Sequence, residues 1–178
     1  EKEPICLIYA SKSFYPDKKY YVNGIATAVL GIERPNPNAK ISRSDYIERV
    51  KGYRENKGVF EVLLKNSAGE LTEGSKSNLF FIKGDTVITA PSHMVLEGIM
   101  RKYVFEICNT LGIHIDDSRP VEFSALSDMD GAFITGTSIN VLPISCIEEI
   151  AHYNTKNAVL QSIIKEFEER IAEEWQKN

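Results

Sequence analysis

Three short polar segments of the chain contain residue types that could bind an anionic group. They are residues 72–78 (Thr-Glu-Gly-Ser-Lys-Ser-Asn), residues 96–101 (Leu-Glu-Gly-Ile-Met-Arg) and residues 135–140 (Thr-Gly-Thr-Ser-Ile-Asn). A glycine at a helix start and a turn of glycine, threonine and serine both present free backbone N–H groups and hydroxyls, which suit a phosphate. Each segment alone would also fit a surface turn or an ordinary helix cap. Their order and spacing along the chain are therefore what indicates a function.

The sequence argues against several other kinds of active site. The histidines, His93, His114 and His152, are scattered, with no pair at helical spacing and no cluster with cysteine, so no metal site is predicted. The chain also lacks the Gly-x-Ser-x-Gly pattern of serine hydrolases, a Walker-type phosphate loop and the Gly-x-Gly-x-x-Gly pattern of dinucleotide-binding folds. These reaction classes are not expected.

The composition predicts one folded domain without a nucleic-acid or membrane partner. The 178 residues are 43% hydrophobic and 26% charged, which is enough apolar surface for a core. The net charge is −4, no basic run is present, and no apolar stretch is long enough to span a bilayer. The cysteines, Cys6, Cys108 and Cys146, are odd in number and widely spaced, which predicts reduced, packed thiols in a cytoplasmic protein.

The hydrophobic pattern predicts the strands and helices that would position the three polar segments. Strands are expected at residues 5–10, 20–29, 60–64, 79–83, 86–89 and 132–135, with a hairpin turn at Gly84 and Asp85. Helices are expected at residues 44–57 and 98–111, and from about residue 155 towards the C-terminus. Several consecutive strands mixed with helices predict an α/β class without regular β-α-β alternation.

Taken together in this order, four segments resemble the signature of the class IV aminotransferases. This family of pyridoxal-phosphate enzymes, of fold type IV, includes branched-chain aminotransferases, D-amino-acid aminotransferases and 4-amino-4-deoxychorismate lyase. The segments are residues 61–64, 69–80, 98–101 and 133–137, of which the stretch from Leu71 to Phe80 is the most specific. The resemblance covers essentially the whole chain. It implies an α/β fold with a mixed-sheet pseudo-barrel, the large cofactor-binding domain of D-amino-acid-aminotransferase-like enzymes.

The resemblance also implies a role for individual residues. The family's cofactor, pyridoxal 5'-phosphate, is bound by a lysine that matches Lys40, which lies 33 positions before Glu73. Lys51 and Lys57 match less well, because they fall in the predicted helix or at its end. Glu73 matches the carboxylate that keeps the pyridine nitrogen protonated. The remaining matches are the backbone of Ile99 and Met100 and the hydroxyl of Thr137, for the phosphate, and Gly136, Ser138 and Tyr46, near the substrate.

Two features depart from the family pattern. The family usually has threonine where this chain has Met100, so one hydroxyl for the phosphate is missing and weaker cofactor binding is expected. Family members also begin with a smaller N-terminal domain that forms one wall of the substrate pocket. Residues 1–178 match only the C-terminal large domain, and the chain starts at Glu1 rather than methionine, as expected of a piece of a longer protein. These residues alone are expected to be almost inactive, because the site would be open to water.

The expected reaction moves an amino group between an amino acid, of the branched-chain type, and a 2-oxo acid. These small molecules are the expected partners, together with a second copy of the chain, because family members are usually homodimers. Two alternatives stay open. The protein could be a 4-amino-4-deoxychorismate lyase, which eliminates pyruvate without needing a 2-oxo acid, or a non-catalytic domain that keeps the fold.

Overall fold

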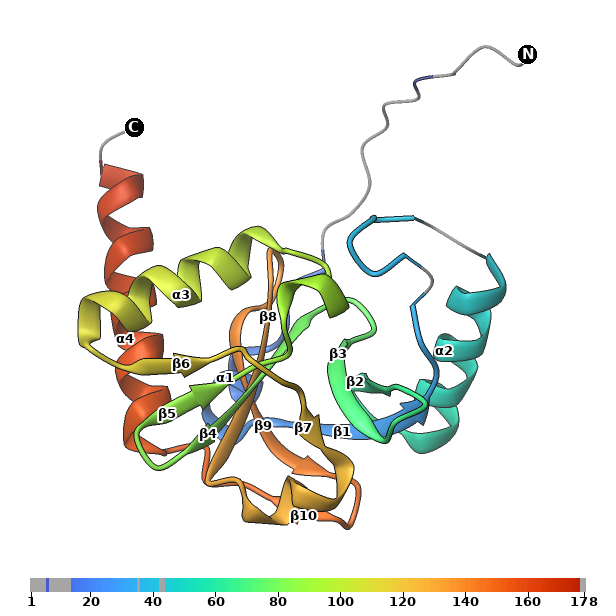
Figure 1. Cartoon of the computed structure of the whole chain (residues 1–178). Helices are drawn as coiled ribbons and strands as arrows, with labels where there is room; N and C mark the ends of the chain where they lie inside the picture. The colour runs from blue at the N-terminus through green and yellow to red at the C-terminus, as the bar shows by residue number, and fades with distance from the viewer. Residues whose placement is uncertain (1–5, 7–13, 35, 42–43, 177–178) are drawn as a thin grey trace.

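The computed structural model describes residue 6 and residues 14–34, 36–41 and 44–176, with side chains as far as residue 173 (Figure 1). The strands are β1 (Ile25–Gly31), β2 (Glu61–Lys65), β3 (Glu70–Gly74), β4 (Asn78–Lys83), β5 (Thr86–Ile88), β6 (His114–Asp116), β7 (Val121–Glu122), β8 (Gly131–Gly136), β9 (Asn140–Ile147) and β10 (Ala151–His152). The helices are α1 (Lys18–Asn23), α2 (Ser44–Lys57), α3 (Ile99–Leu111) and α4 (Ala158–Gln176), with the short 3-10 helices η1 (Ser92–Met94) and η2 (Phe123–Asp128). Within this described part of the chain, none of the helices combines the length and apolar character that crossing a bilayer requires.

The strands form one mixed sheet that curls back on itself. Neighbouring strands follow the order β6-β5-β4-β8-β9-β1-β2-β3-β7, and β10 pairs with the end of β9. Strand β1 pairs in parallel with β2 and with β9, and β5 pairs in parallel with β6. The first and last strands of this order, β6 and β7, are linked by residues 117–120 alone, a connection that spans at most about 18 Å. The two edges of the sheet therefore lie close together, which confirms the predicted mixed α/β fold and its barrel-like sheet.

Strand β9 joins two halves of this sheet. Its first part pairs with β8, where Pro143 lies opposite Phe133, and its second part pairs with β1 from Ile144 onward. Proline is unusual in a central strand because it has no N–H to donate. Here it falls where the strand changes partners. We call β4, β5, β6 and β8 the β8 half, and β1, β2, β3, β7 and β10 the β1 half.

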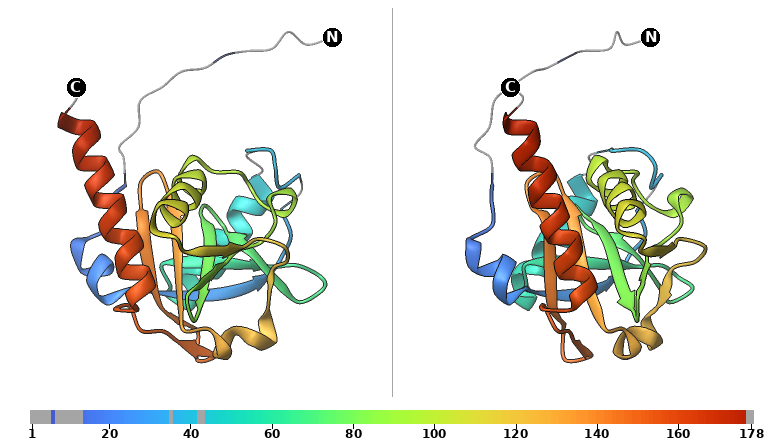
Figure 2. Two further views of the ribbon diagram at one scale, coloured as in Figure 1. Left: turned by 60° about the vertical axis from the view of Figure 1, so that its left-hand side comes forward. Right: turned by 90° about the vertical axis from the view of Figure 1, so that its left-hand side faces the viewer.

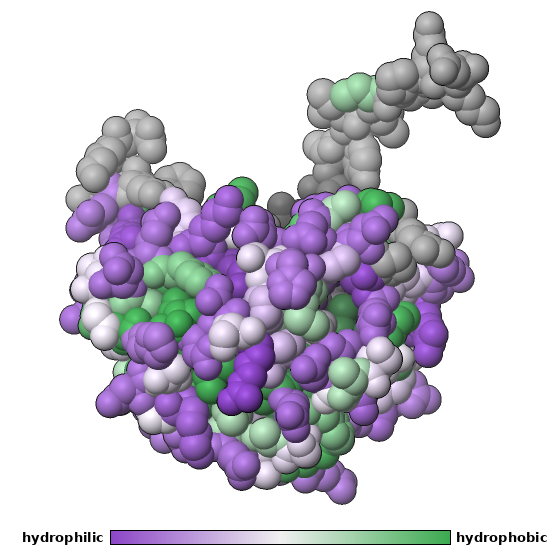
Figure 3. Space-filling view, in the orientation of Figure 1, coloured by the Kyte–Doolittle hydropathy of each residue, from purple (hydrophilic) through white to green (hydrophobic). Residues whose placement is uncertain are grey.

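Buried side chains pack on both faces of the β8 half. Strand β4 shows this arrangement, because Leu79 and Phe81 belong to a cluster with side chains of the β1 half, whereas Phe80 and Ile82 belong to a cluster with side chains of α3 and α4. The rings of Phe80 and Phe133 stack with their centroids 4.9 Å apart. Figure 2 shows α3 and α4 lying against this side of the sheet. The face in Figure 3 is mostly hydrophilic and shows hydrophobic surface in separate patches.

The predicted helices and the predicted hairpin are largely confirmed. Helix α2 has the predicted bounds, and α3 ends before Gly112, which adopts the left-handed conformation with φ 67°. The hairpin between β4 and β5 turns at Gly84, whose φ is 55°. The C-terminal helix begins at Ala158, later than predicted, because the Oδ1 atom of Asn157 accepts a hydrogen bond from the N–H of Leu160 and caps the first turn.

Other predictions were wrong or incomplete. The predicted strand at residues 20–29 is a helix, α1, followed by β1, since Gly24 breaks the chain direction with φ 75°. The pattern also missed β3, β6, β7, β9 and β10. Among the cysteines, Cys108 is buried, which raises the pKa of its thiol to about 12, but Cys6 is exposed rather than packed. The predicted strand at residues 5–10 lies outside the described residues except for Cys6.

Candidate active site

Glu73 lies near the end of β3 with its side chain 2% exposed. Its Oε1 lies 3.0 Å from Nε of Arg34, and its Oε2 accepts a hydrogen bond of 3.1 Å from the backbone N–H of Leu96. Burial raises the pKa of the Glu73 carboxyl, while the charge of Arg34 and the Leu96 N–H oppose that rise. Despite the ion pair, Oε1 accepts no hydrogen bond from the described residues. The Oε1 atom of this buried carboxylate is therefore suited to accept a hydrogen bond from a bound molecule.

Arg34 pairs with Glu73 and also contacts the turn after β3 and helix α2. Its Nη2 donates a hydrogen bond of 2.9 Å to the carbonyl oxygen of Ser75, and its guanidinium carbon lies 6.0 Å from the centre of the Tyr46 ring. The Tyr46 hydroxyl is buried and has no hydrogen-bond partner among the described residues, and burial raises its pKa. Tyr46, predicted near the substrate, therefore lies beside the cation that pairs with Glu73.

A second buried carboxylate, Glu61 on β2, fixes the turn after β3. Its Oε1 accepts hydrogen bonds from the Ser75 hydroxyl (2.6 Å) and the Val62 N–H (2.8 Å), and its Oε2 accepts one from the Ser77 hydroxyl (3.1 Å). Gly74 has no room for a side chain, because an added Cβ would lie 2.0 Å from the Ser77 Oγ. The hydrogen bonds within this tight turn explain why residues 72–78 are mostly polar.

The start of α3 presents backbone N–H groups without a capping side chain. Gly98 is the N-cap residue and makes no side-chain cap, and the first hydrogen bond within the helix runs from the N–H of Lys102 to Gly98. The N–H groups of Ile99 and Met100 precede it and have no acceptor within the helix, so they can donate to an anion. The Ile99 side chain is exposed, whereas the Met100 side chain is 9% exposed and packs in the core beneath α3 and α4.

The turn between β8 and β9 contains the third polar segment. Gly136 and Ser138 are half-buried, and Thr137 is exposed. The turn is closed by a hydrogen bond from the Ile139 N–H to the Gly136 carbonyl (3.1 Å), and the Tyr21 hydroxyl donates to the Ile139 carbonyl (3.2 Å). The residues of this segment that are predicted to contact the substrate and the phosphate thus lie on a fixed turn that is open to solvent.

Lys40 is exposed on the loop between β1 and α2. Two residues earlier, the Asn38 side-chain amide donates to the carbonyl of Ser92 at 2.8 Å and contacts the carbonyl of Val95 at 3.4 Å. Val95 precedes Leu96, whose N–H binds Glu73. The loop that contains Lys40 and the carboxylate of Glu73 are therefore attached to the same short segment before α3.

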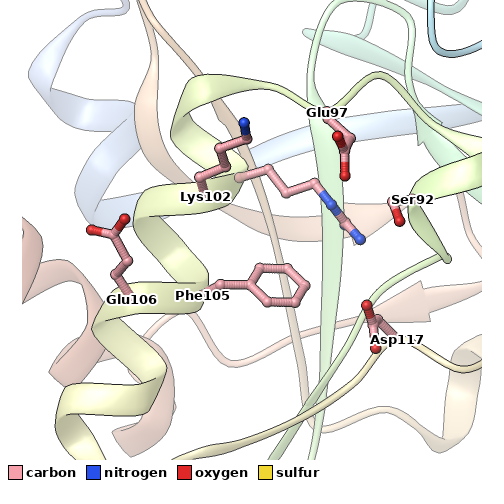
Figure 4. A pocket seen from close by; sticks show the side chains of 7 residues that line it. Ser92, Glu97, Lys102, Phe105, Glu106 and Asp117 are labelled. Carbon is pink, nitrogen blue, oxygen red and sulfur yellow. The ribbon is translucent and has the colours of Figure 1, made fainter.

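A cavity of about 330 Å³ lies beside α3 (Figure 4). It is lined by Ser92, Glu97, Arg101, Lys102, Phe105, Glu106 and Asp117. Arg101 is 4% exposed, and its guanidinium donates to the Thr89 hydroxyl (2.7 Å) and the Ala90 carbonyl (2.8 Å). Because neither Glu73 nor Lys40 lines this cavity, we place the candidate site at Glu73 and the start of α3 instead.

Two residues of the site had no role in the sequence analysis. Glu61 carried a signal, since a charged residue directly before the apolar run Val62-Leu63-Leu64 is expected to have partners if it is buried. Arg34 lies next to a proline-rich turn, and nothing in its surroundings along the chain separates it from an ordinary surface arginine. Its partner, Glu73, lies far away in sequence.

Comparisons with known proteins show which family the chain resembles. The family model described as amino-transferase class IV matches residues 1–147. A probable branched-chain-amino-acid aminotransferase of Aquifex aeolicus is 34% identical over 113 residues, which cover 63% of this chain and 35% of that protein. The branched-chain aminotransferase of Thermoproteus uzoniensis with norvaline superposes with a TM-score of 0.74 at 26% identity, covering 83% of this chain and 52% of that one.

A third relative was solved with a cofactor derivative. It is the T.th. branched-chain amino acid aminotransferase complexed with N-(5'-phosphopyridoxyl)-L-glutamate, with a TM-score of 0.73 and 25% identity over 83% of this chain and 52% of that one. The chain thus spans about a third to a half of the length of these relatives. The match of the family model over residues 1–147, together with the fold, shows that the chain belongs to the class IV aminotransferases.

Proposed function

We propose that these residues form the cofactor-binding part of an aminotransferase that moves an amino group between a branched-chain type amino acid and a 2-oxo acid. The observation that carries this proposal is the connection of a buried acid to an uncapped helix start. Glu73 binds the N–H of Leu96, and Leu96 lies two residues before Gly98, where α3 begins. These two features suit the two charged ends of pyridoxal 5'-phosphate.

The acid fits the ring end of this cofactor. When bound, pyridoxal 5'-phosphate would supply a ring that accepts the electrons left as the substrate Cα loses a proton. Glu73 would accept a hydrogen bond from the ring nitrogen through Oε1, the buried oxygen that accepts none from the described residues. Arg34 favours the ionised form of Glu73, which is the form that keeps a facing nitrogen protonated.

The helix start fits the phosphate end. The free N–H groups of Ile99 and Met100 would donate to the phosphate oxygens, and the positive end of the helix dipole would stabilise the charge. The exposed hydroxyl of Thr137 would add a donor from the turn after β8. Met100 offers its backbone N–H only, because its thioether side chain has no hydrogen to donate.

Lys40 would bind the cofactor covalently and, after release, accept the proton that the substrate Cα loses. Gly136, Ser138 and Tyr46 would lie next to the substrate. We also propose that the active protein is a homodimer and that a separate N-terminal domain closes the site, so that residues 1–178 alone turn over almost no substrate. Turnover by these residues at the rate of the full natural protein would contradict this domain assignment.

The test is chemical labelling of the lysine in the full natural protein. The protein is loaded with pyridoxal 5'-phosphate, reduced with borohydride, digested and mapped. We expect the label on Lys40, and we expect Lys40→Ala to lose both the label and the visible absorption of the bound cofactor. Lys51→Ala, which removes an exposed lysine of α2, should keep both. A label on another lysine would show that the assignment of Lys40 is wrong.

A steady-state assay tests the reaction. Amino-group transfer requires a 2-oxo acid as acceptor, so product should appear only when one is added. Pyruvate release from 4-amino-4-deoxychorismate without an added 2-oxo acid would instead indicate the lyase reaction.

A further inference from the structure

The side chain of Asn78 contacts the segment that leads into α3 at the same residue as Glu73 does. Its Nδ2 donates a hydrogen bond of 2.7 Å to the carbonyl of Leu96, while the N–H of the same Leu96 donates to Glu73. Asn78 is 6% exposed, so the donor side chain of this part-buried hydrogen bond is buried. One residue, Leu96, is therefore bound through both of its backbone polar groups by two buried side chains.

The same amide also touches the start of the helix. A Cβ added to Gly98 would lie 2.5 Å from the Asn78 Oδ1, closer than packed atoms approach. The backbone of Gly98, with φ −69° and ψ 148°, is open to any residue. The backbone conformation would accept a side chain at residue 98, but that side chain would displace the Asn78 amide.

The position of Asn78 in the sheet explains how it reaches both features. It is the first residue of β4, it follows the turn that begins after Glu73, and it pairs with Thr135 of β8. Thr135 immediately precedes Gly136, at the turn between β8 and β9. Asn78 thus lies at the point where the end of β3, the start of α3 and the end of β8 meet.

We infer that Asn78 is a positioning residue that sets the distance between the Glu73 carboxylate and the N–H groups at the start of α3. This inference rests on the proposed function, in which those two groups bind opposite ends of pyridoxal 5'-phosphate. Loss of the Asn78 amide should free the helix start while Glu73 keeps Arg34 as its partner. The phosphate contact should then weaken more than the ring contact.

The experiment compares binding of pyridoxal 5'-phosphate and of pyridoxal, which lacks the phosphate, to the full natural protein. The variants are Asn78→Ala and Gly98→Ala. The control is Tyr153→Phe, which removes another buried hydrogen bond from a side chain to a backbone carbonyl, that of Leu126. In both site variants we expect the Kd of pyridoxal 5'-phosphate to rise about tenfold and that of pyridoxal by less than about twofold. The control should leave the ratio of the two constants unchanged.

The double variant adds a second test of the same contact. Once Asn78 is alanine, the space beside residue 98 is open, so Gly98→Ala should then have little further effect on the ratio. Gly98→Ala alone carries the test if Asn78→Ala does not fold. If a folded variant still binds pyridoxal 5'-phosphate and the ratio of the two Kd values is unchanged, only the role of Asn78 is overturned. Failure of the unsubstituted protein to bind pyridoxal 5'-phosphate would overturn the proposed function as well.

Discussion

Arg34 and Glu73 form an ion pair in which Nε and Oε1 are 3.0 Å apart and the side chains are 14% and 2% exposed. The pair joins the loop after β1 to the end of β3, and thereby anchors the start of the loop that leads to Lys40. A carboxylate this deeply buried depends on its cation to stay ionised. The electrostatic state of the candidate site is therefore set by a residue of the loop that contains the candidate lysine.

Substitution Arg34→Met should destabilise the protein. It leaves Glu73 buried without its counter-charge, and we expect the free energy of unfolding at neutral pH to fall by roughly 3 kcal/mol. The double variant Arg34→Met/Glu73→Gln should recover most of this loss, because no buried charge is left unpaired. Urea denaturation of the variants measures both effects. Strictly additive losses would mean that the two side chains do not interact.

The stability effect of Glu73→Gln should depend on pH. Because the folded state raises the pKa of Glu73, the folded protein binds a proton more readily than the unfolded chain. Stability relative to the Gln variant should therefore fall as pH rises from the ordinary value, near 4.5, through the raised pKa, and then level off. Denaturation curves across this range test the sign, and a rise with pH would contradict it.

Removal of Glu61 should loosen the turn after β3. Glu61→Ala leaves three hydrogen-bond donors without their acceptor, and we expect a loss of roughly 3 kcal/mol in the free energy of unfolding. Glu61→Gln keeps one acceptor oxygen and should lose less. The control is Glu55→Ala, which removes an exposed carboxylate that lies 3.9 Å from the Nζ atom of Lys51, and which should change stability by less than about 0.5 kcal/mol. Equal losses for Glu61→Ala and this control would refute the role of Glu61.

Substitution Met100→Thr should lower the stability of the protein and raise its affinity for pyridoxal 5'-phosphate. Thermal unfolding should show a loss of roughly 2 kcal/mol, because a buried apolar side chain is shortened. Under the proposed function the new hydroxyl would donate to the phosphate, so the Kd of pyridoxal 5'-phosphate should fall several-fold, about what one hydrogen bond contributes. Met100→Leu conserves volume and adds no donor, so it should change neither quantity much. An unchanged Kd in the Thr variant would argue against a phosphate at this helix start.

The sequence predicted elements whose signals are local. Helix α3 carries its apolar stripe and its terminal Gly112 within one stretch of chain, so its bounds could be predicted without knowing its neighbours. Strand β9 could not, because Pro143 argues against a central strand. Only the change of partner from β8 to β1 makes a proline acceptable there.

The residues of the candidate site also divide into those with a local sequence signal and those that depend on distant contacts. Glu73 lies in a specific motif, and the resemblance to the family singled it out. Arg34 and Asn78 act through contacts that exist only in the folded chain, with partners on other elements. Lys40 lies on the loop between β1 and α2, and its covalent role stays a prediction.

The shared strand β9 has a consequence for how the molecule unfolds. Residues 140–143 of this strand pair with β8 and residues 144–147 with β1, so unfolding of β9 removes pairing partners from both halves at once. Glu73 belongs to one half, and the strands beneath α3 belong to the other. Amide hydrogens on both sides should accordingly exchange with deuterium in one cooperative event, and any opening of that unit would dismantle the acid and the helix start together.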